Sequence, residues 1–144
     1  MYKWKTAGFN KKIVKALESH KYEFDLGKVK ADLVKNEIRY VPRYDKEYPK
    51  RLKEIVGHPI GLFIKGKILP EDDTCLAVVG TRKITPYGIE VTRLFVGGLA
   101  LRRVTIVSGM ARGIDGMAHR TALENGGRTI AVVGSGLDII YPPE

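Results

Sequence analysis

A turn that combines glycines with an arginine is the part of this sequence best equipped for chemistry. The β-branched run Val104–Val107 stops at Ser108 and Gly109, and helical spacing begins near Gly113. This pattern predicts a strand, a tight turn and a helix. Backbone N–H groups in such a turn, backed by the positive end of the helix dipole, attract phosphate, and the guanidinium of Arg112 can add a paired hydrogen bond. We interpret the turn as a candidate anion cradle; the alternative is an ordinary strand-to-helix connection with a solvent-exposed arginine.

Two further apolar runs, Leu76–Val79 and Thr129–Val133, also predict strands, and each ends in a glycine-containing turn. The three strands and their connections predict a partial Rossmann-like α/β fold, a three-layer parallel sheet with a small N-terminal helical extension. The carboxyl ends of parallel strands lie at one edge, so the three turns should converge there as one positively charged rim. The candidate phosphate-binding residues of this rim are Gly80, Thr81, Arg82, Lys83, Ser108, Gly109, Arg112, Gly134, Ser135 and Gly136.

Two helices should position these turns against the sheet. The first is expected to start at Pro86 behind a Thr85 N-cap, and the second to run from near Gly113 to about Asn125. Glycines inside the first helix each cost about 1 kcal/mol of helix stability relative to alanine. Close packing of the helix on the sheet, which needs positions without a side chain, would explain their presence. The positions concerned are Gly97 and Gly98, and the side chains expected to face the core from this helix are Val91, Leu94, Phe95 and Leu99.

The positive charge of the chain is concentrated before the sheet. The formal net charge is +9, and residues 1–53 hold 15 Lys/Arg against 7 Asp/Glu, whereas residues 54–144 hold 10 against 9. A basic arm beside a nearly neutral core suggests a polyanion partner, because neutralising phosphates releases counterions. The alternative is a solvated lysine-rich surface that keeps the protein soluble.

We expect two parts of unequal size. Residues 1–40 form a basic helical extension with a helix at Phe9–His20 and a second helical face around Val29–Val34, and residues 41–144 form the sheet domain. Short elements should precede the sheet: a helix at Lys50–Ile55, a strand at Leu62–Ile64 and a loop at Pro70–Asp73.

Enzyme chemistry is poorly represented. The first strand is not followed by Gly-x-Gly-x-x-Gly, and the sequence holds neither a Walker lysine motif nor a Cys/His cluster with metal-ligand spacing, so we expect no catalysis, no cofactor and no metal. Asp115 and His119 share one helical face and could form an acid/base pair. The favoured interpretation is that Asp115 binds N-terminal helix amides and His119 packs or accepts a structural hydrogen bond.

The single cysteine and the absence of long apolar runs point to a cytoplasmic location. Cys75 cannot form an internal disulfide, which fits a reducing compartment. The sequence contains neither a targeting segment nor a run of membrane-spanning length, so we expect no membrane partner.

Four ordered motifs resemble the DprA (Smf) family of DNA-processing proteins, and a lead-in around Tyr48–Leu52 agrees with that family as well. The motifs are Ala77–Lys83, Thr85–Gly88, Ile106–Asp115 and Gly134–Pro142. The resemblance runs from about Pro42 to the last residue. It implies an extended Rossmann domain that binds single-stranded DNA and hands it to RecA during natural transformation, without catalysis.

By position, the resemblance makes Arg82 the expected phosphate contact, with Lys83, the amides of Ser108 and Gly109, and Arg112 beside it. Met110 stands where the family often has a second glycine. Family members continue with the rest of the sheet, further basic motifs and a dimerisation surface, so this chain resembles an N-terminal part of the domain. A homodimer is expected for the full-length protein.

Two other functions remain open on the sequence. The first is a nucleotide- or phosphosugar-binding enzyme related to nucleoside-monophosphate phosphoribohydrolases, although their Pro-Gly-Gly-x-Gly-Thr loop is absent here. The second is a basic first helix that docks a protein or duplex DNA independently of the sheet domain.

Overall fold

The computed structural model of this chain describes residues 12, 14–15, 19, 25–139 and 141–142. The chain separates into two compact units, Met1–Glu37 and Ile38–Glu144. The helix predicted at Phe9–His20 lies largely outside the described residues, and the domain boundary predicted after residue 40 stays a prediction.

In the first unit, α2 spans Leu26–Lys35. It begins behind Asp25, whose carboxylate accepts a hydrogen bond from the N–H of Lys28 at 3.1 Å and so satisfies one of the unpaired amides of the first turn. The second helical face predicted around Val29–Val34 is therefore confirmed.

The second unit opens with a two-stranded antiparallel ribbon. β1 (Ile38–Pro42) pairs with β2 (Gly61–Lys65), and the short helix α3 (Lys50–Lys53) lies in the connection between them. Val41 and Tyr48 are buried, and the hydroxyl of Tyr48 donates a hydrogen bond to the carbonyl of Pro59 at 2.8 Å. The strand β2 and the helix α3 were predicted, whereas β1 was not.

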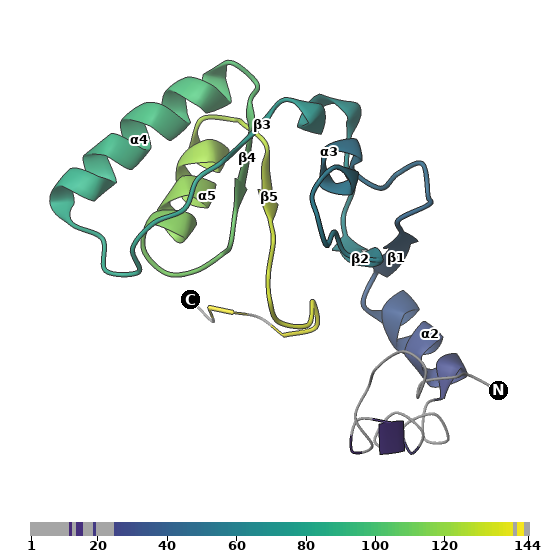
Figure 1. The fold of residues 1–144 in the computed structure, drawn as a ribbon. Helices are drawn as coiled ribbons and strands as arrows, with labels where there is room; N and C mark the ends of the chain where they lie inside the picture. The colour runs from purple at the N-terminus through teal and green to yellow at the C-terminus, as the bar shows by residue number, and fades with distance from the viewer. Residues whose placement is uncertain (1–11, 13, 16–18, 20–24, 140, 143–144) are drawn as a thin grey trace. The chain divides into compact units, whose positions relative to one another are not determined.

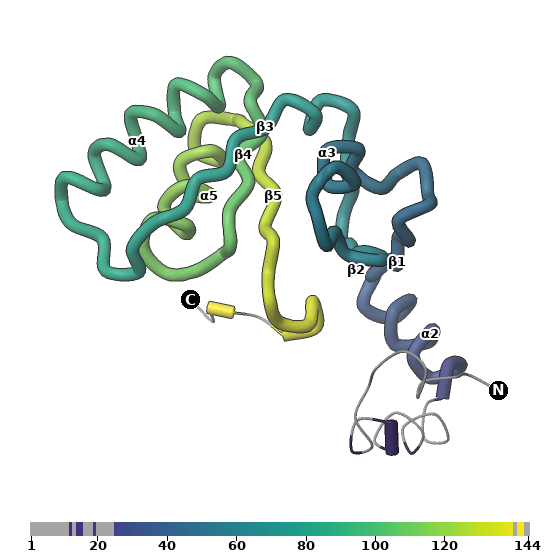
Figure 2. The backbone as a smooth tube through the Cα atoms, in the orientation of Figure 1, coloured from purple at the N-terminus to yellow at the C-terminus, as the bar shows by residue number. Residues whose placement is uncertain are grey.

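The main sheet is parallel, as predicted. Its strands are β3 (Cys75–Ala77), β4 (Thr105–Ser108) and β5 (Thr129–Ala131), and the order is β3-β4-β5. The helix α4 (Pro86–Leu101) connects β3 to β4, and α5 (Ile114–Glu124) connects β4 to β5. Figure 1 and the backbone trace of Figure 2 show the two helices side by side beside the sheet.

The hydrophobic core lies between these helices and the central strand. Val96 of α4, Ile106 of β4, and Ala118 and Ala122 of α5 are fully buried and form one cluster. Successive right-handed crossovers in one direction place both helices on the same face of the sheet. Among the described residues the other face lacks such a cover, and Val79 at the end of the first apolar run is 74% exposed. A continuous apolar run such as Leu76–Val79 is typical of a strand that is covered on both faces, and cover on the second face is not seen here.

The helix α4 starts as predicted, because the hydroxyl of Thr85 accepts a hydrogen bond from the N–H of Gly88 at 3.1 Å. Its predicted core face is wrong in part, since Leu94 and Phe95 are 73% and 64% exposed. The helix packs instead through smaller residues, and the buried positions are Thr92, Val96, Gly97 and Ala100.

Contact between α4 and α5 explains why the buried face of α4 differs from the predicted one. A Cβ on Gly97 would lie 3.4 Å from the side-chain nitrogen of Asn125, the C-cap residue that follows α5. The close approach predicted for Gly97 therefore involves α5 rather than the sheet. Small residues at this crossing let the two helices approach each other closely, and the bulky side chains are left outside.

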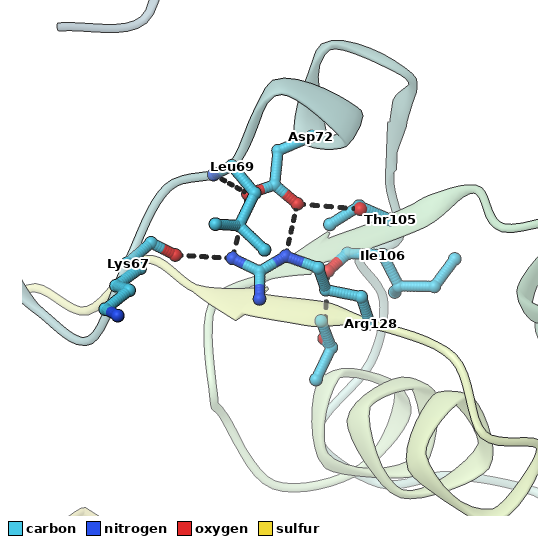
Figure 3. A network of polar contacts seen from close by, with 7 residues as sticks. Lys67, Leu69, Asp72, Thr105, Ile106 and Arg128 are labelled. Carbon is cyan, nitrogen blue, oxygen red and sulfur yellow. Dashed lines mark hydrogen bonds and ion pairs between the residues drawn. The ribbon is translucent and has the colours of Figure 1, made fainter. Parts of the chain in front are cut away.

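A buried carboxylate joins the segment before the sheet to the sheet itself (Figure 3). Asp72 lies in the 3₁₀ helix η2 (Pro70–Asp73), where the sequence predicted a loop. It accepts hydrogen bonds from the N–H of Leu69 at 2.7 Å, from the hydroxyl of Thr105 at 2.8 Å, and from the Nε and Nη2 atoms of Arg128 at 2.6 and 2.9 Å.

This network fixes the charge of its members. Burial alone raises the pKa of Asp72, but the hydrogen bonds from Arg128, Leu69 and Thr105 outweigh burial and leave the pKa below its ordinary value. The hydrogen bond to Asp72 raises the pKa of Arg128 in turn. Arg128 also donates to the carbonyl of Lys67, so one side chain holds both the lead-in segment and the start of β5.

Candidate nucleic-acid interface

Two of the three predicted turns meet at the carboxyl edge of the sheet. The N–H of Ile114, which follows β4, donates a hydrogen bond to the carbonyl of Thr81, which follows β3, at 3.1 Å. A Cβ on Gly113 would lie 2.1 Å from that carbonyl oxygen, and Gly113 also has a φ of +82°. A Cβ on Gly80 would lie 2.6 Å from the side chain of Ile114. Glycine at these two positions is what allows the contact.

The same contact brings the backbone segments that carry Arg82 and Arg112 close together in space. A Cβ on Gly113 would lie 2.8 Å from the Cα of Arg82, so the backbone of Arg82 lies against the residue that follows Arg112. Both arginine side chains are exposed. The predicted convergence of the first two turns is therefore present.

The turn after β3 presents unused hydrogen-bond donors. The hydroxyl of Thr81 accepts a hydrogen bond from the N–H of Lys83 at 3.2 Å, which shapes the turn. Among the described residues, the N–H groups of Gly80, Thr81 and Arg82 have no hydrogen-bond partner, and all three residues are exposed. Successive unpaired amides beside cationic side chains form a concavity suited to an anion. Arg82 and Lys83 form no ion pair with any described residue.

The turn after β4 is different, because an internal carboxylate occupies it. Asp115 is buried, and its Oδ2 atom accepts hydrogen bonds from the N–H groups of Gly109 at 3.2 Å and Ala111 at 3.4 Å. The amide of Gly109, considered for phosphate in the sequence analysis, therefore already binds an anion of the protein. The favoured interpretation of Asp115 holds, with the difference that the bound amides belong to the turn before α5 rather than to the helix.

Two neighbours of this turn have structural roles. The hydroxyl of Ser108 is buried and donates a hydrogen bond to the carbonyl of Val78 at 2.6 Å, which ties β4 to the end of β3. Its hydrogen is not available to a phosphate in this arrangement. Met110 has a φ of +60°, a left-handed conformation that glycine adopts more easily than methionine does.

The third turn stands apart from the other two. β5 is prolonged by one hydrogen bond from the N–H of Val132 to the carbonyl of Ser108, at 2.8 Å. Beyond it, in the described part of the chain, no hydrogen bond joins the turn Gly134–Gly136 to either of the other turns. Figure 1 shows the yellow chain running on past the end of β5 and making a hook before it comes back.

Asp115 and His119, which the sequence allowed as an acid/base pair, are both buried. His119 is 6% exposed and Asp115 is 7% exposed. The hydroxyl of Thr129 donates to the carbonyl of Ile106 at 2.8 Å, so its contact of 2.6 Å with His119 requires the Nδ1 atom of histidine to be the donor. Burial lowers the pKa of His119, and the charge of Asp115 offsets this only in part, so the imidazole is neutral near pH 7. These contacts indicate a structural role.

A groove of about 650 Å³ runs from Arg112 along α5, with Met117 and Leu123 among its lining residues. Near this edge Tyr87 is 75% exposed and Tyr141 is 48% exposed. In the part of the chain that the structure describes, no group of His, Cys, Asp and Glu side chains could hold a metal ion. None of the described helices is both long and apolar enough to cross a bilayer.

Comparison with known proteins agrees with this architecture. Residues 39–144 match the family model of DNA recombination-mediator protein A. The chain is 45% identical to Protein Smf of Escherichia coli over 102 residues, which are 71% of this chain and 27% of that protein. It spans about a quarter to a third of the length of curated relatives such as this one and DprA of Streptococcus pneumoniae.

Solved structures give the same result. The crystal structure of DNA processing protein A from Streptococcus pneumoniae superposes with a TM-score of 0.69 and 39% identity, covering 85% of this chain and 42% of that one. The protein of the same name from Helicobacter pylori, whose structure addresses its single-stranded DNA binding mode, gives a TM-score of 0.62 and 32% identity over 75% of this chain and 48% of that one.

Proposed function

The chain belongs to the family of DNA recombination-mediator protein A, and from this premise we propose that it binds single-stranded DNA at the edge formed by the turns after β3 and β4. In this proposal Arg82 and Lys83 contact phosphate, and the N–H groups of Gly80, Thr81 and Arg82 bind the phosphate oxygens. Arg112 adds charge from the neighbouring turn.

The unpaired donors of the turn after β3 carry this proposal. Ligands of α/β sheets bind outside the carboxyl ends of the strands, and this turn occupies that position. In the neighbouring turn, Asp115 already binds the amides of Gly109 and Ala111. The proposed phosphate site therefore centres on Arg82 rather than on the turn around Gly109.

A site of this kind reads the sugar-phosphate backbone rather than the base sequence. Phosphate contacts fix the path of a strand and carry no sequence information, so affinity should depend on salt more than on base composition. The relative from Helicobacter pylori, described for its single-stranded DNA binding mode, supports the choice of a single strand.

The wider role is part of the same proposal. We infer that the protein acts in the cytoplasm by binding rather than by catalysis, that it delivers the bound strand to RecA during DNA uptake, and that the full-length protein forms a homodimer. In this proposal the turns after β3 and β4 supply the contact to the strand.

Replacement of Arg82 tests the strand contact. Arg82→Ala should weaken binding of a labelled oligothymidine about tenfold in fluorescence anisotropy, as expected for the loss of roughly 1.4 kcal/mol from one charge-assisted contact. Arg102→Ala is the matched control, because Arg102 is an exposed arginine at the other end of α4. Equal binding by the two variants would place the DNA site elsewhere.

A further inference from the structure

The ribbon of β1 and β2 presents two aromatic rings to solvent on one of its faces. Tyr40 and Phe63 are cross-strand partners, with ring centroids 5.1 Å apart and an angle of 50° between the ring planes. They are 45% and 57% exposed. Side chains alternate between the faces of a strand, so the buried Val41 points to the opposite face.

The position of Tyr40 depends on a glycine in the opposite strand. A Cβ on Gly61 would lie 2.3 Å from the Cζ and hydroxyl oxygen atoms of the Tyr40 ring. The ring therefore lies over Gly61, in space that any other residue would fill. Gly61 and Phe63 flank the ring of Tyr40 and hold it against the ribbon, so little rotamer freedom remains to be lost when a ligand binds.

The segment that carries these rings has a net positive charge. The segment from Ile38 to Lys67 holds eight Lys/Arg and three Asp/Glu. Lys65 follows Phe63 by two residues and so lies on the same face, and it is exposed. Arg39 lies on the opposite face, where it pairs with Glu47 at 2.6 Å. The aromatic face thus keeps a cation of its own within a segment of net positive charge.

We propose that this aromatic face, formed by Tyr40, Phe63 and Lys65, is a second contact for single-stranded nucleic acid. One or two bases stack on the rings, and the ammonium group of Lys65 contacts an adjacent phosphate. The inference rests on the proposed function and extends it to a place outside the turns after β3 and β4.

A nucleic-acid strand fits this face better than an apolar protein surface does. Proteins that bind single-stranded nucleic acid without sequence preference use exposed aromatic side chains interleaved with cations, because every base has a face that can stack. An apolar partner would leave the net positive charge of the segment without a counterpart. The expected ligand of this face is therefore a nucleic-acid strand that carries bases.

Substituting the rings by leucine separates stacking from charge. In the full chain, Phe63→Leu should weaken binding of a labelled oligothymidine about tenfold, near the lower end for one lost stacked base, and Tyr40→Leu should have a similar effect. Neither variant loses a phosphate contact, so the salt dependence of binding should stay as in the parent. An abasic oligonucleotide should bind the parent and Phe63→Leu equally.

The control and the outcomes keep this inference distinct from the proposed function. Phe95→Leu makes the same change at an exposed phenylalanine on α4 and should leave binding unchanged. Weaker binding by Arg82→Ala together with parental binding by Phe63→Leu would overturn the ribbon contact alone, whereas parental binding by both would overturn the proposed function as well. An equal loss on the abasic strand, or a change of oligomeric state without loss of DNA binding, would also overturn the stacking proposal. Thermal unfolding of each variant checks that it is folded.

Discussion

Replacing Asp72 by asparagine should destabilise the sheet domain by about 2–3 kcal/mol. The asparagine oxygen can still accept the hydrogen bonds that reach Oδ1 from Thr105 and the Nε atom of Arg128, but its amide nitrogen cannot accept those that reach Oδ2 from Leu69 and the Nη2 atom. Hydrogen bonds to charged groups contribute about 1.5–3 kcal/mol each. The side chain of Arg128 is 34% exposed, which reduces the sum because water screens that part of the loss.

Urea-induced unfolding followed by circular dichroism measures this loss directly. The matched control is Asp73→Asn, which removes an exposed carboxylate one residue along the chain. The pKa of Asp72 is lowered in the folded state, so its contribution is present above about pH 4 and is lost as the pH falls through the folded pKa. The parent should lose this part of its stability in acid, and Asp72→Asn should not. A free energy of unfolding for Asp72→Asn within about 0.5 kcal/mol of the control would refute the reasoning.

Two further predictions concern the turn and the buried histidine. Gly113→Ala should destabilise the protein by more than about 3 kcal/mol, because the new Cβ would lie 2.1 Å from the carbonyl oxygen of Thr81. Gly57 also has a positive φ but has open space around it, so the control Gly57→Ala should cost about 1–2 kcal/mol. Similar urea midpoints for the two variants would contradict this prediction. His119 has a lowered pKa in the folded state, so stability should fall as the pH drops below about 6.5, where the unfolded chain binds a proton that the folded chain does not. His119→Asn keeps a donor toward Thr129 and should flatten this dependence between about pH 7 and pH 5; an unchanged slope in urea titrations would argue against it.

Local signals predicted the main sheet and both of its helices. Thr85 and Pro86 mark the start of α4, and the glycines after each apolar run mark the turns. These signals work because capping and turn conformation depend on residues close in sequence. The same reasoning missed β1, where Tyr40 lies on an exposed face and the usual alternation of apolar and polar residues is absent.

Features that depend on distant residues could not be predicted in this way. Arg128 and Asp72 are 56 residues apart, so only the folded chain shows that they form a pair. The core face of α4 was displaced because small residues face α5 and leave Leu94 and Phe95 outside. The role of Asp115 was one of two open interpretations, and the fold decides it by bringing the carboxylate onto the amides of Gly109 and Ala111.

The salt dependence of strand binding tests the proposed site most directly. Each phosphate contact to a single strand contributes about 0.7 to the slope of the logarithm of the binding constant against the logarithm of salt concentration. Titrations of a labelled oligothymidine at several salt concentrations should therefore give Arg82→Ala a weaker affinity and a slope shallower by about 0.7 than the parent. The same affinity and the same slope for both proteins would contradict the assignment of Arg82 as a phosphate contact.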